Sequence, residues 1–116
     1  MKTLMIAIQS QIMTDIFSEH FRKEYEVHTC IEGNEALRLL QELKPDILII
    51  DLSLPHITGL SVLQQTCYTP PAIISLTDYL SDDIVHEAQQ SGVGALIRIP
   101  CTIECIASNI NRLQNK

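Results

Sequence analysis

Hydrophobic and polar positions follow two alternating periods along this chain. Short apolar runs predict buried β-strands, and apolar residues at three- and four-residue steps predict amphipathic helices. The expected strands cover residues 4–8, 25–30, 47–50, 72–76 and 94–99. The expected helices cover residues 12–21, 34–43, 60–66, 82–90 and 103–113. Strand and helix therefore alternate five times, which predicts a parallel sheet covered by helices on both faces.

Helix-capping and helix-breaking residues separate these elements. Asn34 is expected to cap the second helix, and Pro45 prevents that helix from continuing. Pro55 and Gly59 mark the loop after the third strand. We find no internal repeat, low-complexity tract or linker, and therefore expect one α/β domain over residues 1–116.

The most informative stretch is the third strand and the carboxylate that ends it. Residues 47–50 are all branched apolar residues, as in a central parallel strand buried on both faces, and Asp51 follows directly. In open α/β sheets, ligands bind at the carboxyl ends of the strands. Asp is also common as a cap of tight turns. The strand alone favours neither a chemical nor a capping role for Asp51.

Composition narrows the class of protein. The chain is 46% hydrophobic and has no Trp, so its core must be largely aliphatic. A formal net charge of −6 argues against direct nucleic-acid binding by this domain. No apolar stretch reaches the length of a membrane span, and no signal peptide is recognisable, so we expect a cytoplasmic protein. The cysteines at 30, 67, 101 and 105 lack the paired spacing of zinc sites, and we expect reduced thiols.

The whole chain resembles the receiver domain of bacterial two-component response regulators. The resemblance is carried by Asp51 at the phosphoacceptor position, Pro55 and Gly59 in the next loop, Thr77 after the fourth strand and Pro100 after the fifth. It implies a single flavodoxin-like (βα)5 domain with strand order 2-1-3-4-5 and helices on both faces. It also implies that Thr77 is the switch hydroxyl and that the Ile99–Pro100 peptide bond is cis.

The family's chemistry requires groups that this sequence lacks. Receivers hold Mg²⁺ with an acidic pair after the first strand, the acceptor Asp and a backbone carbonyl two residues on, and a lysine after the fifth strand binds the phosphoryl group. Here the acidic pair falls on Gln9 and Ser10, the carbonyl on Ser53, and the lysine on Ile99. Mg²⁺ prefers charged oxygens, and isoleucine donates no hydrogen bond.

Two further positions depart from the family pattern. Asp78 stands where most receivers carry a small residue, and its charge would repel an incoming phosphoryl group. Leu96 stands at the position of the aromatic switch residue. We expect an atypical receiver that acts as a protein-interaction or dimerisation module, without catalytic residues, resident metal or cofactor.

Two alternatives stay open. Asp51 could still accept a phosphoryl group, in which case Mg²⁺ would be required. A flavodoxin-like enzyme or cofactor-binding protein is disfavoured, because no glycine-rich phosphate loop follows any expected strand.

The resemblance also implies partners. Receivers interact with histidine kinases and with attached or separate output domains, and they often dimerise through the fourth helix, fifth strand and fifth helix. On this chain that surface would carry Val85, His86, Gln89, Arg98, Asn109 and Arg112. The chain is expected to be either a whole single-domain protein or the receiver part of a longer regulator.

Overall fold

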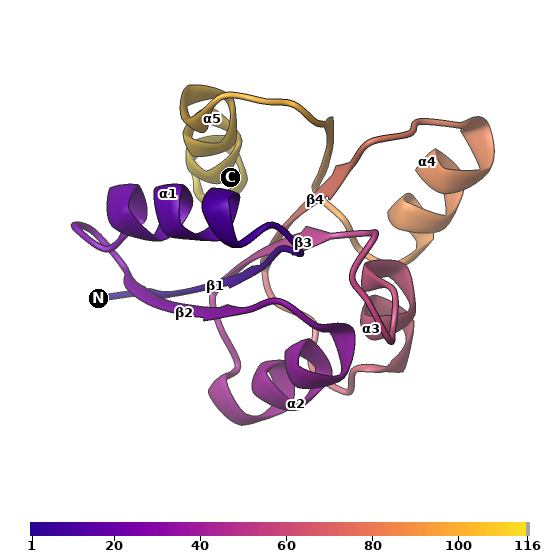
Figure 1. The fold of residues 1–116 in the computed structure, drawn as a ribbon, viewed down its shortest axis with the longest axis horizontal. Helices are drawn as coiled ribbons and strands as arrows, with labels where there is room; N and C mark the ends of the chain where they lie inside the picture. The colour runs from indigo at the N-terminus through magenta and orange to yellow at the C-terminus, as the bar shows by residue number, and fades with distance from the viewer. Residues whose placement is uncertain (116) are drawn as a thin grey trace.

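The computed structural model describes residues 1–115 and confirms the five-fold alternation (Figure 1). The strands are β1 (Thr3–Ala7), β2 (Glu26–Cys30), β3 (Ile47–Asp51), β4 (Ala72–Thr77) and β5 (Ala95–Arg98). The helices are α1 (Gln11–Phe21), α2 (Gly33–Leu43), α3 (Gly59–Gln65), α4 (Asp82–Gln90) and α5 (Ile103–Gln114). All strand pairs are parallel, in the order β2-β1-β3-β4-β5, so the flavodoxin-like topology is also confirmed.

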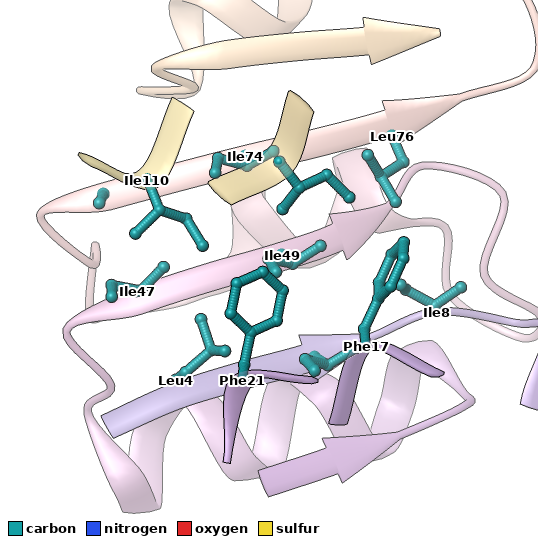
Figure 2. Packing of buried hydrophobic residues seen from close by; sticks show 12 residues of the cluster. Leu4, Ile8, Phe17, Phe21, Ile47, Ile49, Ile74, Leu76 and Ile110 are labelled. Carbon is teal, nitrogen blue, oxygen red and sulfur yellow. The ribbon is translucent and has the colours of Figure 1, made fainter. Parts of the chain in front are cut away.

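One face of the sheet is covered by α1 and α5. Alternate strand residues such as Ile49 and Ile74 meet Phe17 and Phe21 of α1 and Ile106 and Ile110 of α5 (Figure 2). The side chains alternate because successive residues of a strand point to opposite faces. The buried residues of this layer are aliphatic apart from two phenylalanines, as the composition predicted.

The opposite face is covered by α2 and α3, while α4 lies beside β4 and β5 (Figure 1). Leu48, Ile50 and Ile73 pack there against Leu40 of α2 and Val62 of α3. In α4 only Ala88 is buried, so this helix covers its part of the sheet thinly. A hollow of about 210 Å³ remains between α4 and β5.

The element boundaries agree with the sequence prediction within one or two residues, but the predicted cap of α2 is wrong. The N-cap is Glu32, which makes no side-chain capping hydrogen bond, and Asn34 lies inside the helix. The Gly33 N–H instead donates to the Pro55 carbonyl at 3.0 Å. A tertiary contact with the loop after β3 therefore sets where α2 begins, overriding the local preference for Asn as a cap.

Among residues 1–115, no helix is both long and apolar enough to cross a membrane.

Cys30 is buried at the end of β2, and burial raises the pKa of its thiol to about 12. At neutral pH this thiol is therefore protonated and packs as a small apolar side chain.

The sheet's central layer gives a first prediction. Ile49 is fully buried, and Ile49→Ala is expected to lower the free energy of unfolding by about 2–5 kcal/mol through lost burial and the cavity left behind. The same substitution at Ile12, which is 74% exposed, should change stability by less than about 0.5 kcal/mol. Urea denaturation followed by circular dichroism measures both. Equal losses at the two positions would contradict this packing.

Candidate functional site

A hollow of about 430 Å³ lies at the carboxyl ends of β1, β3, β4 and β5. It brings together six residues singled out by sequence, Gln9, Ser10, Asp51, Ser53, Asp78 and Ile99, and Met13 also lines it. We call this hollow the Asp51 cavity. The topology places it at the edge where parallel α/β sheets bind ligands.

Asp51 is the deepest polar group of the cavity. Its side chain is only 5% exposed, and its two oxygens accept different backbone N–H groups. Oδ1 accepts from Ser53 at 2.9 Å, and Oδ2 accepts from Gln9 at 3.3 Å. The Ser53 contact is a turn-capping bond of the kind Asp commonly makes. Asp51 therefore does have the capping role, in a position that also faces the cavity.

Gln9 and Ser10, where the resemblance implies an acidic pair, each have a local structural contact. The Ser10 hydroxyl accepts the Met13 N–H at 3.2 Å and so caps the first turn of α1. Serine is among the best N-cap residues. Gln9 reaches Asp51 through its backbone N–H.

Thr77 is not brought to the cavity wall. Its hydroxyl donates to the Tyr79 carbonyl at 2.9 Å and accepts the Tyr79 N–H at 3.2 Å, which closes a tight turn after β4. The side chain is 3% exposed, and the neighbouring Asp78 lines the cavity in its place. The cavity lining thus includes the carboxylate of Asp78 but not the hydroxyl of Thr77, which the resemblance implied as the switch group.

Ile99 lines the cavity and also packs against the aliphatic layer under α1 and α5. Its backbone N–H donates to the Thr77 carbonyl at 2.8 Å, which ties the end of β5 to β4. The Ile99–Pro100 peptide bond is cis. The position implied for the lysine is therefore adjacent to Asp51 in space but carries an apolar side chain.

Sequence reasoning missed two residues of this region. Met13 lines the cavity from the first turn of α1, and its place three residues after the capping Ser10 is the only sequence signal for it. Gly59 was noted as a loop residue that carries the resemblance, but its contact with Asp51 was not foreseen. A Cβ at Gly59 would lie 2.3 Å from the Asp51 carbonyl oxygen, so the α3 N-terminus packs directly on the end of β3.

His56 lies in the same loop but outside the cavity wall. It has a positive φ of 69°, and its Nε2 lies 3.2 Å from the Glu32 carboxylate. Among residues 1–115, no group of three or more His, Cys, Asp or Glu side chains is placed to hold a metal ion.

The sequence-predicted interaction surface lies on three neighbouring elements. Val85, His86 and Gln89 are on α4, and each is exposed. Arg98 ends β5, and Asn109 accepts a hydrogen bond from Arg112 one turn later on α5 at 2.9 Å. Val85 and Gln89 also line the hollow of about 210 Å³ between α4 and β5, with Leu80 and Leu96.

The family model described as "Response regulator receiver domain" matches residues 5–111. The chain belongs to the receiver domain family. Receiver domains are signalling modules of two-component systems that interact with kinases and output domains. The match runs from β1 into α5 and therefore includes every residue that lines the Asp51 cavity.

Solved structures share this fold at low sequence identity. A receiver domain protein (CheY-like) from Methanospirillum hungatei JF-1 is 18% identical, with a TM-score of 0.88 over 99% of this chain and 95% of that one. Chemotaxis protein CheY4 of Vibrio cholerae is 24% identical, with a TM-score of 0.86 over 97% and 98%. A response regulator from Burkholderia pseudomallei, solved with a phosphorylated aspartic acid, calcium ion and citrate, is 24% identical, with a TM-score of 0.83 over 99% and 72%.

The close packing at Gly59 gives a second prediction. Gly59→Ala is expected to destabilise the fold by at least about 1–3 kcal/mol, because the new methyl group meets backbone atoms that cannot move aside. Gln64→Ala, on an exposed position of α3, is the matched control and should change stability by less than about 0.5 kcal/mol. Thermal unfolding measures both. A Gly59→Ala protein as stable as the control would show that α3 does not rest on Asp51.

Proposed function

We propose that this chain is an atypical receiver that acts as a protein-interaction or dimerisation module, with impaired or absent Mg²⁺-dependent phosphorylation. The observation that carries the proposal is the lining of the Asp51 cavity. Gln9, Ser10 and Ile99 occupy it where the family's chemistry requires two carboxylates and an ammonium group. Phosphoryl transfer depends mostly on such electrostatic groups, so their loss should remove most of the catalysis.

The donor set supports weak Mg²⁺ binding at best. Mg²⁺ demands near-ideal octahedral geometry and gives up its water reluctantly, so it is usually held by carboxylates. The Ser10 oxygen already accepts a hydrogen bond as a helix cap, and the Gln9 side chain supplies only a neutral oxygen. Two carboxylates, Asp51 and Asp78, line the cavity, and Asp78 is exposed to solvent, so Asp51 is the one buried carboxylate among the lining residues.

The switch machinery is altered as well. A phosphoryl group on Asp51 would meet no ammonium group at Ile99 and would lie near the negative charge of Asp78. The Thr77 hydroxyl already has a donor and an acceptor in Tyr79. To follow a phosphoryl group it would first have to break both bonds.

The proposed partner surface is formed by α4, β5 and α5. Its apolar hollow beside Val85 and the polar tips of His86, Gln89, Arg98, Asn109 and Arg112 give the mixed character of a protein interface. The proposed occupants are a histidine kinase, an output domain or a second copy of this chain. The net charge of −6 disfavours direct nucleic-acid binding by this domain.

One observation favours the alternative, a working phosphoacceptor. The Asp51 carboxylate faces an open hollow of about 430 Å³, large enough for a phosphoryl group. The Burkholderia pseudomallei response regulator, which shares this fold, carries a phosphorylated aspartic acid.

A phosphorylation experiment gives the third prediction. Incubation with acetyl phosphate and Mg²⁺ is expected to leave the intact mass unchanged, because neither the metal nor the phosphoryl group finds its charged partners. Intact-protein mass spectrometry measures this, with a receiver that keeps the acidic pair and the lysine as the positive control. A stable gain of one phosphoryl group that Asp51→Asn removes would establish the alternative.

The fourth prediction concerns restoration of the chemistry. Gln9→Asp, Ser10→Asp and Ile99→Lys together are expected to give Mg²⁺-dependent phosphorylation of Asp51, since Asp also caps helices well and the three groups act as a unit. Each single variant is expected to stay unphosphorylated in the same assay. Full phosphorylation of Ser10→Asp alone would show that the other two positions do not limit the reaction.

A further inference from the structure

The Asp51 cavity has an unbalanced charge. Of the residues that line it, Asp51 and Asp78 are acidic, and the others are neutral. None of the ion pairs among residues 1–115 includes either carboxylate. The lysine position, which would balance this charge, is Ile99. The charge of the cavity is therefore complementary to a positively charged group brought from outside.

Asp51 can accept further hydrogen bonds from such a group. Each of its oxygens accepts one backbone N–H, and a carboxylate oxygen has two lone-pair positions. The two N–H groups hold the carboxylate in one orientation at 5% exposure. A charge-assisted bond to a preoriented, largely buried carboxylate is stronger than one to a carboxylate in water.

The cavity wall favours an organic cation with an alkyl stem. Met13 and Ile99 supply apolar surface beside the carboxylates, and the methylene groups of an arginine side chain pack well on such surface. The planar guanidinium can donate two parallel bonds to one carboxylate and gives up its water more easily than an ammonium group. A strongly hydrated Mg²⁺ ion would gain nothing from the apolar wall.

We propose that the Asp51 cavity binds an arginine side chain of a protein partner. This inference rests on the proposed function, because a Mg²⁺ ion held by Asp51 would occupy the carboxylate oxygens that the guanidinium needs. A protein partner is favoured over a free amine because Ile12 and Ile16, on the helix that carries Met13, are 74% and 50% exposed. An arginine flanked by apolar residues matches both the charge of the cavity and the exposed apolar residues of α1.

The test is a titration of the full chain, labelled with ¹⁵N, with the peptide acetyl-Leu-Arg-Leu-amide. The backbone amides of Gln9 and Ser53 report on the site, because both donate to the Asp51 carboxylate. Saturable shifts of these two amides are expected. The same peptide with citrulline, which keeps the shape but loses the charge, is expected to bind at least about tenfold more weakly.

Two matched pairs of variants locate the binding. Asp51→Asn should weaken the arginine peptide by about tenfold or more, while Asp83→Asn, which removes an exposed charge from α4, should leave its affinity unchanged. Ile99→Lys places an ammonium group of the chain itself beside Asp51 and should abolish binding of the arginine peptide. Ile99→Met keeps the cavity wall apolar and should leave that binding intact.

The outcomes separate this inference from the proposed function. Equal affinity for the citrulline peptide, no effect of either Asp51→Asn or Ile99→Lys, or shifts confined to other residues would overturn the arginine pocket. If spermidine bound as tightly as the peptide, the protein-partner part would be wrong. In a separate experiment, acetyl phosphate and Mg²⁺ are added to the same labelled protein. Phosphorylation of Asp51 there would overturn the proposed function, whereas an unchanged mass without peptide shifts would overturn the arginine pocket alone.

Discussion

The burial of β3 on both faces is the constraint on which the rest of the structure depends. Ile47 and Ile49 belong to the layer under α1 and α5, and Leu48 and Ile50 belong to the layer under α2 and α3. All four side chains are fully buried, and the strand pairs with β1 on one side and β4 on the other. Both cores therefore include β3, as they include its neighbours β1 and β4, and Asp51 at the end of β3 is held at the edge of the sheet.

The carboxylate of Asp51, at the end of an otherwise apolar strand, needs hydrogen-bond partners, and the residues that supply them also line the Asp51 cavity. Asp51 ends β3 with its backbone packed against Gly59 and its carboxylate bonded to the N–H groups of Gln9 and Ser53. Leaving a buried carboxylate unsatisfied would cost more than the bonds gain. One side chain can thus cap the turn and also face the cavity, and the presence of Asp51 does not by itself require phosphorylation.

The sequence predicts those parts of the structure that depend on local patterns. The apolar runs of β3 and β4 and the stripe of α5 lie where periodicity places them, because burial against neighbours selects the same residues in any such sheet. The strand order and the meeting of Gln9, Asp51 and Ile99 at one edge came from the family resemblance. Periodicity carries no information on which strands pair.

What the sequence could not predict depends on contacts between distant residues. The start of α2 is set by the bond of Gly33 to Pro55, so the preference of Asn34 for a cap position was misleading. The Thr77 hydroxyl is oriented by the turn to Tyr79, and its residue type alone did not reveal this. The side chains of Gln9, Ser10 and Ile99 also have different structural environments, which the sequence alone did not reveal. Ser10 caps a helix and Ile99 packs on the core, whereas the Gln9 side chain lies exposed. Two of the three side chains therefore contribute to the fold directly, so the fold at this edge is held without the acidic pair and the lysine that the resemblance implies there.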